Sequence, residues 1–109
     1  MSGLPTLEEV RGWIGISDFE LPDDQLADIL AGETGVQAAD CVIPDPYPAE
    51  LKLAMFRRCA RAAAARGLPL GSLPVADSGM GGQYGAAILP RLDAEIERYE
   101  HEHRVIGIA

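Results

Sequence analysis

Hydrophobic side chains recur every three or four residues along most of this 109-residue chain. That spacing places apolar residues on one face of an α-helix. It predicts four helices, over residues of about 6–16, 23–42, 48–66 and 90–103. We therefore expect an all-α fold, a small bundle of about four helices.

The third helix, 48–66, is predicted to be the central one because it is apolar on two sides. Its two apolar faces comprise Leu51, Met55, Cys59 and Ala62, and Leu53, Phe56, Ala60 and Ala63. A helix with two such faces packs between neighbours. Pro48 suits its first position, where a missing N–H has no helical partner to lose. Its remaining surface is expected to carry Arg57, Arg58 and Arg61.

The first two helices carry weaker signals. Thr6 and Glu9 have the spacing of a capping box at the start of the first helix, and Trp13 is expected to anchor the core. The apolar positions of the second helix are Leu26, Ile29, Leu30, Val36 and Ala39. Gly32 and Gly35 each weaken this helix by about 1 kcal/mol relative to alanine, and either permits close packing or a bend.

The fourth helix is predicted to begin at Pro90, which again suits a first helical position. Its inner stripe comprises Leu92, Ile96, Tyr99 and His103. Its outer face comprises Asp93, Glu95, Glu97, Arg98, Glu100 and Glu102. Two pairs four residues apart, Glu97 with His101 and Arg98 with Glu102, are expected to interact along the helix.

The segments between and after the helices differ in kind. Residues 44–48 form a proline-rich turn, with Tyr47 packed at the corner between the second and third helices. Residues 68–89 form a long glycine-rich loop, which we expect to be mobile in its first half. This loop lacks the Gly-Lys-Ser/Thr of a phosphate loop. Residues 104–109 are apolar and either fold back on the core or form an extended arm that inserts into a partner. We expect one helical domain, 1–103, followed by this C-terminal arm.

Charge is distributed unevenly along the chain, whose net charge is −8. Residues 1–50 carry a net charge of −10, residues 51–67 carry +5 and residues 68–109 carry −3. The overall excess of acids argues against a nucleic-acid-binding protein. Two interpretations of the basic segment stay open: it pairs with acidic helices of its own chain, or part of each surface meets a neighbouring subunit.

Candidate chemistry is sparse. Cys41 and Cys59 are expected to be free thiols on apolar helix faces, not a disulfide framework. A zinc site that combines them with His101 and His103 is conceivable but disfavoured, since the two histidines point to different sides of a helix. No catalytic triad or dyad has a recognisable spacing, so we expect no enzyme, no metal and no cofactor. We see no signal peptide and no membrane-spanning run, and expect synthesis in a reducing cytoplasm.

Several phrases of the sequence together resemble a known family. They are Trp13 in a short helix, then Asp-Asp-Gln-Leu at 23–26, Tyr-Pro-Ala-Glu-Leu at 47–51, Arg-Arg-Cys-Ala-Arg-Ala at 57–62, Ala-Arg-Gly-Leu-Pro-Leu-Gly at 65–71 and Leu-Pro-Arg-Leu-Asp-Ala-Glu-Ile at 89–96. In this order, which covers nearly the whole chain, they resemble the head–tail connector (adaptor) proteins of tailed bacteriophages, in particular long-tailed phages of actinobacteria.

The resemblance implies an all-α structural subunit of the virion neck, made in the host bacterial cytoplasm. Such subunits form a homo-oligomeric ring, typically dodecameric, beneath the portal protein. The ring extends the DNA channel and offers a platform for the next head-completion or tail protein; DNA passes without sequence-specific binding. The portal-docking arm would comprise Arg104, Val105, Ile106, Gly107, Ile108 and Ala109. Contacts between subunits would comprise Arg57, Arg58, Arg61, Tyr84, Ile88 and Leu89.

A different class of function is the alternative, a small cytoplasmic helical regulator or protein-interaction module. Its support is the cluster of Arg57, Arg58 and Arg61, which could contact nucleic-acid phosphates. A recognition helix also needs base-reading side chains near its N-terminus, and Ala49 to Leu53 offers few. Salt-dependent binding of short DNA would favour this interpretation over the connector.

Overall fold

The computed structural model describes residues 3–66 and 84–105, with side chains given for all of these except 84–88. This part of the chain contains four α-helices and the segments that connect them. They are α1 (Leu7–Ile14), α2 (Asp23–Asp40), α3 (Ala49–Ala65) and α4 (Tyr84–Glu100), and a short 3₁₀ helix, His101–His103, continues α4. Within these residues there are helices and no strands, which confirms the predicted all-α fold.

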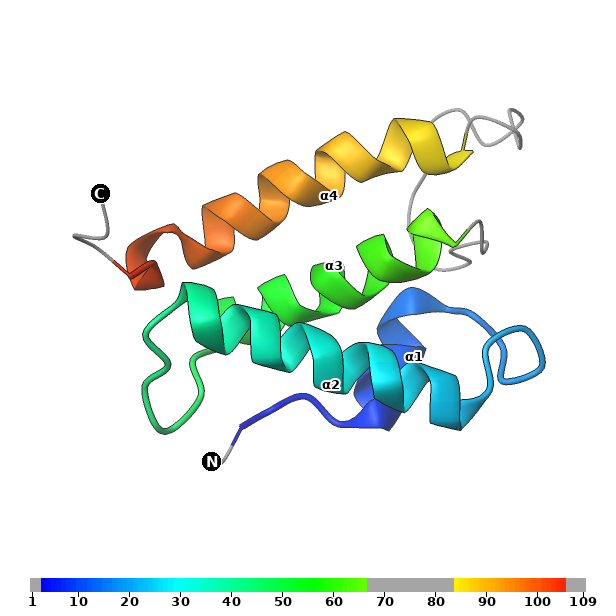
Figure 1. Ribbon diagram of the computed structural model, residues 1–109, viewed down its shortest axis with the longest axis horizontal. Coiled ribbons are helices and arrows are strands. Elements are labelled where there is room, and N and C mark those ends of the chain that lie inside the picture. The colour runs from blue at the N-terminus through cyan, green and yellow to red at the C-terminus, as the bar shows by residue number, and fades with distance from the viewer. Residues whose placement is uncertain (1–2, 67–83, 106–109) are drawn as a thin grey trace.

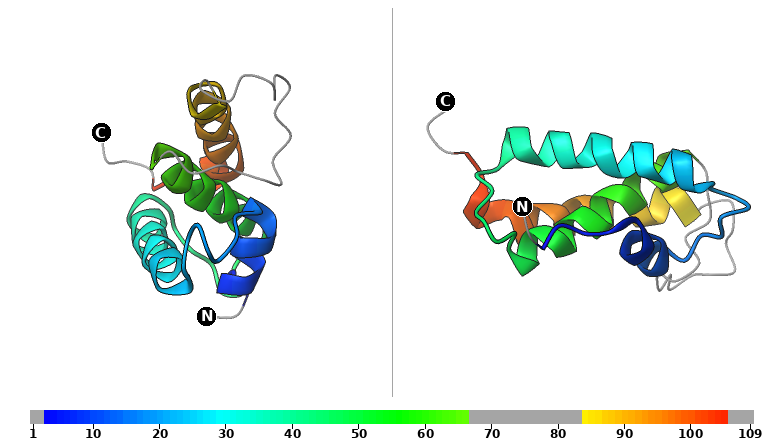
Figure 2. Two further views of the ribbon diagram at one scale, coloured as in Figure 1. Left: turned by 90° about the vertical axis from the view of Figure 1, so that its right-hand side faces the viewer. Right: turned by 90° about the horizontal axis from the view of Figure 1, so that it is seen from below.

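The helix α3 lies in the middle of the arrangement, as its two apolar faces predicted. It lies between α2 and α4 and runs antiparallel to both (Figure 1). Seen end-on, α4 covers one side of α3, while α1 and α2 cover the other (Figure 2). The three neighbouring helices all contact α3, so it supplies the common surface on which they are held.

The apolar core has a large part and a small part. The large part draws on every helix and includes Val10, Ile14, Leu26, Ile29, Met55, Cys59, Ala63 and Leu92. The small part lies at the α2–α3 turn and comprises Cys41, Tyr47 and Leu51. Tyr47 is buried at that corner, as predicted. Cys41 is also buried, but it follows α2 in an extended conformation and does not lie on a helix face.

Local sequence accounts for the ends of α1. The hydroxyl of Thr6 accepts a hydrogen bond from the backbone N–H of Glu9, and the Glu9 carboxylate accepts one from the Thr6 N–H, which confirms the capping box. Gly15 ends the helix at φ 79°, a left-handed conformation that glycine adopts without a Cβ clash.

Two helix boundaries differ from expectation. The helix α2 ends at Asp40 and does not reach Val42, because Cys41 and Val42 turn into an extended segment that bonds to the C-terminal residues. The helix α4 begins at Tyr84, so Pro90 lies inside it. Proline has no N–H to donate to the helix. The helix continues through it because Leu89 and Leu92, on either side, pack on the main core.

Candidate functional site

A buried ion pair between α3 and α4 is the most prominent polar feature of the described residues. The guanidinium of Arg58 contacts the carboxylate of Glu100 through two short bonds, Nε to Oε2 at 2.6 Å and Nη2 to Oε1 at 2.7 Å. Arg58 is 3% exposed and Glu100 is 0% exposed. Such a two-point contact fixes both distance and orientation, so it sets how α4 lies on α3.

Two neutral side chains complete this buried polar centre. Gln37 of α2 donates from Nε2 to Glu100 Oε2 at 2.9 Å and to the Leu51 carbonyl at 3.2 Å. Tyr47 donates its hydroxyl hydrogen to Oε1 of Gln37. We use "buried polar centre" for Arg58, Glu100, Gln37 and Tyr47. It ties α2, the α2–α3 turn, α3 and α4 together.

The surroundings of the buried polar centre keep both ions charged. Burial by itself would raise the pKa of Glu100, but hydrogen bonds from Arg58 and Gln37 outweigh it and hold that pKa below its usual range. Burial likewise opposes the charge of Arg58, but contacts with Glu100 outweigh it and raise the Arg58 pKa. Burial, and then the charge of Glu100, raises the pKa of Tyr47 above its ordinary value. At neutral pH the centre is an ion pair with a neutral phenol beside it.

These positions correct two expectations from the sequence. The helical pattern predicts Arg58 on the remaining surface of α3, outside its apolar faces, and Glu100 on the outer face of α4. Both placements were wrong, because each charged group is buried against the other. Helical spacing alone would have placed Glu100 on the inner stripe, because it lies four residues after Ile96 and eight after Leu92.

The other two arginines of α3 also contact acids of the same chain. Arg57 Nε lies 2.8 Å from Glu95 Oε1. Arg61 Nη1 lies 2.8 Å from Asp93 Oδ1, and Arg61 Nη2 lies 4.0 Å from Glu33. These are the contacts expected when the basic helix pairs with acidic helices of its own chain.

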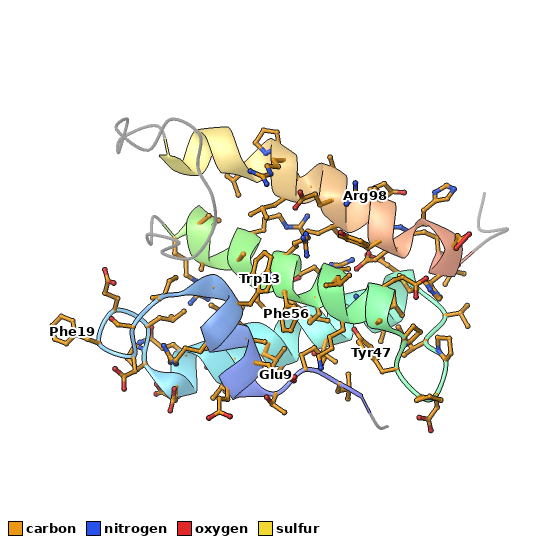
Figure 3. All side chains as sticks on the ribbon, turned by 180° about the vertical axis from the view of Figure 1, so that it is seen from behind. Glu9, Trp13, Phe19, Tyr47, Phe56 and Arg98 are labelled. Carbon is orange, nitrogen blue, oxygen red and sulfur yellow. The ribbon has the colours of Figure 1, made fainter. Side chains whose placement is uncertain are left out.

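Aromatic rings and guanidinium groups form a continuous series across α1, α3 and α4, which we call the aromatic–arginine series. The rings of Trp13 and Phe56 stack with centroids 5.8 Å apart (Figure 3). The Arg57 guanidinium lies 4.9 Å from the Trp13 ring and 4.8 Å from the Tyr99 ring. Arg98 lies 4.8 Å from the same Tyr99 ring. Contacts of this kind between cations and aromatic faces hold the side chains in register.

The C-terminal residues fold back on the end of α2. The Val42 N–H donates to the His103 carbonyl at 2.7 Å, and the Val105 N–H donates to the Asp40 carbonyl at 3.0 Å. Arg104 adds an ion pair across this junction, with Nη1 lying 3.7 Å from Asp40 Oδ2 of α2, and its Nη2 lies 2.6 Å from Glu97 Oε1 of α4. We call these contacts the C-terminal junction.

The remaining predicted site residues have different outcomes. Of the predicted portal-docking arm, Arg104 and Val105 are described and belong to the C-terminal junction, whereas residues 106–109 lie outside the described residues. Tyr84 and Ile88 belong to α4, and their side chains also lie outside them. Leu89 packs against the main core. Most of the loop predicted at 68–89 likewise falls outside, except that residues from Tyr84 onward are helical.

Both cysteines are free thiols buried in the subunit. Burial raises the pKa of Cys41 to about 11 and that of Cys59 to about 12. The thiolate is the reactive form of cysteine, and it is scarce at neutral pH when the pKa is this high. Both residues therefore act as small hydrophobic side chains at neutral pH.

The described residues hold no metal site and no membrane-spanning helix. In residues 3–66 and 84–105, no group of three or more His, Cys, Asp or Glu side chains could hold a metal ion. No helix in the described part of the chain combines the length and hydrophobicity needed to cross a membrane. Comparisons with protein-family models, curated proteins and solved structures found no match.

Proposed function

We propose that this chain is a structural subunit of a bacteriophage head–tail connector, with no enzymatic activity. In this proposal it forms a homo-oligomeric ring beneath the portal protein, extends the DNA channel and binds the next neck or tail protein. The sequence resemblance supports the proposal. The structural observation that supports it best is the internal neutralisation of the basic helix α3.

That neutralisation matters because a connector must let DNA pass without holding it. Arg57, Arg58 and Arg61 each have a carboxylate partner in their own chain. With these bases occupied, the acidic excess of the chain is left to dominate its outer surface. A carboxylate-rich surface repels the phosphates of a duplex, which suits a channel lining.

The same observation weakens the alternative of a DNA-contacting regulator. That function requires the arginine cluster of α3 to reach phosphates. Arg58 is buried, and Arg57 is held between two aromatic rings and Glu95. The expected result is no salt-dependent binding of a short DNA duplex at low ionic strength.

The C-terminal junction refines the proposed portal-docking arm. Arg104 and Val105 are used within the subunit, so in this proposal they anchor the arm. Residues 106–109 are then the part that contacts the portal. An extended apolar segment of this length can add to a partner through backbone bonds and side-chain pockets.

The test is a binding experiment with the portal protein of the source phage. We expect the full chain to bind the portal and a chain ending at Val105 to lose that binding while it keeps its helical circular dichroism. A matched control, Val36→Ser on the exposed side of α2, should bind like the wild type. Binding that is unchanged by the truncation would overturn the arm assignment. Absence of the protein from purified virions and neck complexes, checked by mass spectrometry and electron cryomicroscopy, would overturn the function.

A further inference from the structure

An aromatic side chain stands almost fully in water on the turn between α1 and α2. Phe19 is 91% exposed and projects from one end of the molecule (Figure 3). Among the described residues it is the most exposed of the large hydrophobic side chains. Moving a phenylalanine side chain out of water is favourable. An isolated phenylalanine at a turn is therefore suited to insertion into a partner.

The turn that carries Phe19 is firmly held. Arg11 donates to the Ile16 carbonyl at 3.0 Å and to the Leu21 carbonyl at 2.7 Å. Ile16 and Leu21 are buried on either side of the turn. The Ser17 carbonyl accepts the Leu21 N–H at 3.0 Å. A side chain presented on such a fixed turn loses little further freedom when it binds.

Charges around Phe19 indicate what kind of surface it fits. Asp18 and Glu20 flank it, and both are exposed. Neither has an ion-pair partner within the described residues. A partner surface should therefore offer an aromatic side chain a cation to stack on, with no carboxylates close to that cation.

Such a cation is present at the exposed end of the aromatic–arginine series. Arg98 is exposed, lies 4.8 Å from the Tyr99 ring and donates from Nη2 to the Tyr99 hydroxyl at 2.9 Å. No carboxylate of the described residues lies within ion-pair distance of it, so the expected pair with Glu102 was wrong. The Tyr99 contacts hold the guanidinium in place and leave its charge without a counter-ion.

We propose that the Phe19 turn of one copy of this chain docks on Arg98 of the next copy. The Phe19 ring would lie on the guanidinium, and Asp18 and Glu20 would supply the missing negative charge. Phe19 projects from one end of the subunit, whereas Arg98 lies on α4, beyond the middle of the long axis, so the two are on different surfaces (Figure 3). A contact between them is therefore head-to-tail, the type that can close into a ring. The inference rests on the proposed function, for which it names the contact between subunits.

The test measures self-association of the full chain by sedimentation velocity over a range of concentrations. We expect wild-type chains to associate, and both Phe19→Ser and Arg98→Ala to associate at least about tenfold more weakly. Both residues are exposed, so the variants should keep the wild-type circular dichroism and melting temperature. Val36→Ser, which alters an exposed apolar side chain of α2, is the matched control and should associate like the wild type.

Mixing the two variants gives a sharper result. The Phe19→Ser chain keeps Arg98, and the Arg98→Ala chain keeps Phe19, so one intact contact can form between them. We expect the mixture to form dimers but no larger species. Wild-type chains that stay monomeric into the millimolar range, variants that associate like the wild type, or a mixture that stays monomeric would each overturn the inference.

The inference and the proposed function fail differently. A wrong inference leaves portal binding by the wild type intact while Phe19→Ser has no effect on association. A wrong function appears as a chain that self-associates through Phe19 and Arg98 but does not bind the portal. Loss of portal binding in Phe19→Ser with unchanged self-association would assign Phe19 to the portal and overturn the contact between copies.

Discussion

Arg58 and Glu100 lie on different helices, 42 residues apart in the chain, and contact each other through two bonds of 2.6 and 2.7 Å in the interior. Their pairing joins the central helix to the last one. Gln37 adds the second helix to the same carboxylate. The Glu100 carboxylate thus links three helices through its contacts with Arg58 and Gln37.

Breaking this ion pair from one side should be strongly destabilising. We predict that Glu100→Gln lowers the free energy of unfolding by about 3–5 kcal/mol, because the buried charge of Arg58 loses its closest partner and keeps only the 3.5 Å contacts with Glu33 and Asp40. Urea denaturation followed by circular dichroism measures this. The control is Arg61→Ala, which removes an exposed ion pair with Asp93 and should cost less than about 1 kcal/mol. Equal losses in the two variants would contradict the prediction.

Replacing both ions together should recover much of that loss. In the double variant Arg58→Met, Glu100→Leu, no charge is left buried, and Gln37 still donates to the Leu51 carbonyl. Apolar pairs of similar volume often match or exceed buried ion pairs in stability. We therefore expect the double variant to be more stable than Glu100→Gln alone. Additive losses would show that Arg58 and Glu100 contribute independently.

The depressed pKa of Glu100 predicts acid sensitivity. In the folded chain this carboxyl has a pKa below its unfolded value of about 4.3, so the unfolded state takes up its proton first. The stabilisation is fully present above that unfolded pKa and is lost as pH falls through the folded one. Stability of the wild type should fall as pH is lowered from 6 to 3, measured by urea denaturation at each pH.

The contribution of Glu100 to this acid sensitivity can be isolated with a variant. Glu100→Gln has no proton to take up at this position, so its stability should fall less steeply over the same pH range. It should retain a part of the slope that comes from Glu95, since Arg57 outweighs the effect of burial and lowers the pKa of that carboxyl too. Parallel pH profiles for wild type and Glu100→Gln would show that the buried carboxyl has no part in it.

The spacing of hydrophobic residues was enough to predict the helical fold. The prediction was wrong where a polar or charged residue is buried, because such residues were expected on the surface. The central place of α3 followed from its two apolar faces. Glu100 was assigned to the surface because it is charged, although it continues the stripe of Leu92 and Ile96. In α2, the pattern predicts Val36 and Ala39 as apolar inner positions, but both are exposed and Gln37 between them is buried. A polar residue becomes a core residue only when a partner from another helix satisfies it, and no single helix pattern contains that partner.

Glycines in α2 offer a way to stabilise the subunit. An added Cβ at Gly32 or Gly35 would meet nothing within 4 Å, so neither glycine is needed for close packing within the subunit. We predict that Gly32→Ala and Gly35→Ala each raise the free energy of unfolding by about 0.5–1 kcal/mol, because alanine loses less backbone entropy in a helix. The matched control is Gly15→Ala, which should lower stability because its φ of 79° disfavours a Cβ. Thermal unfolding of the three variants provides the comparison.

The buried thiols can report on the C-terminal junction. Cys41 pairs across the junction with Arg104, whereas Cys59 lies in the main core. Native wild-type protein should react slowly with a thiol reagent at both positions, because both thiols are buried and have raised pKa values. We predict that Arg104→Ala, which removes the ion pair with Asp40 across the junction, speeds labelling of Cys41 but not of Cys59. A local loss of about 1 kcal/mol corresponds to about a fivefold faster reaction if labelling follows local opening. Peptide mass spectrometry separates the two sites, and equal acceleration at both would mean that the variant opens the whole subunit.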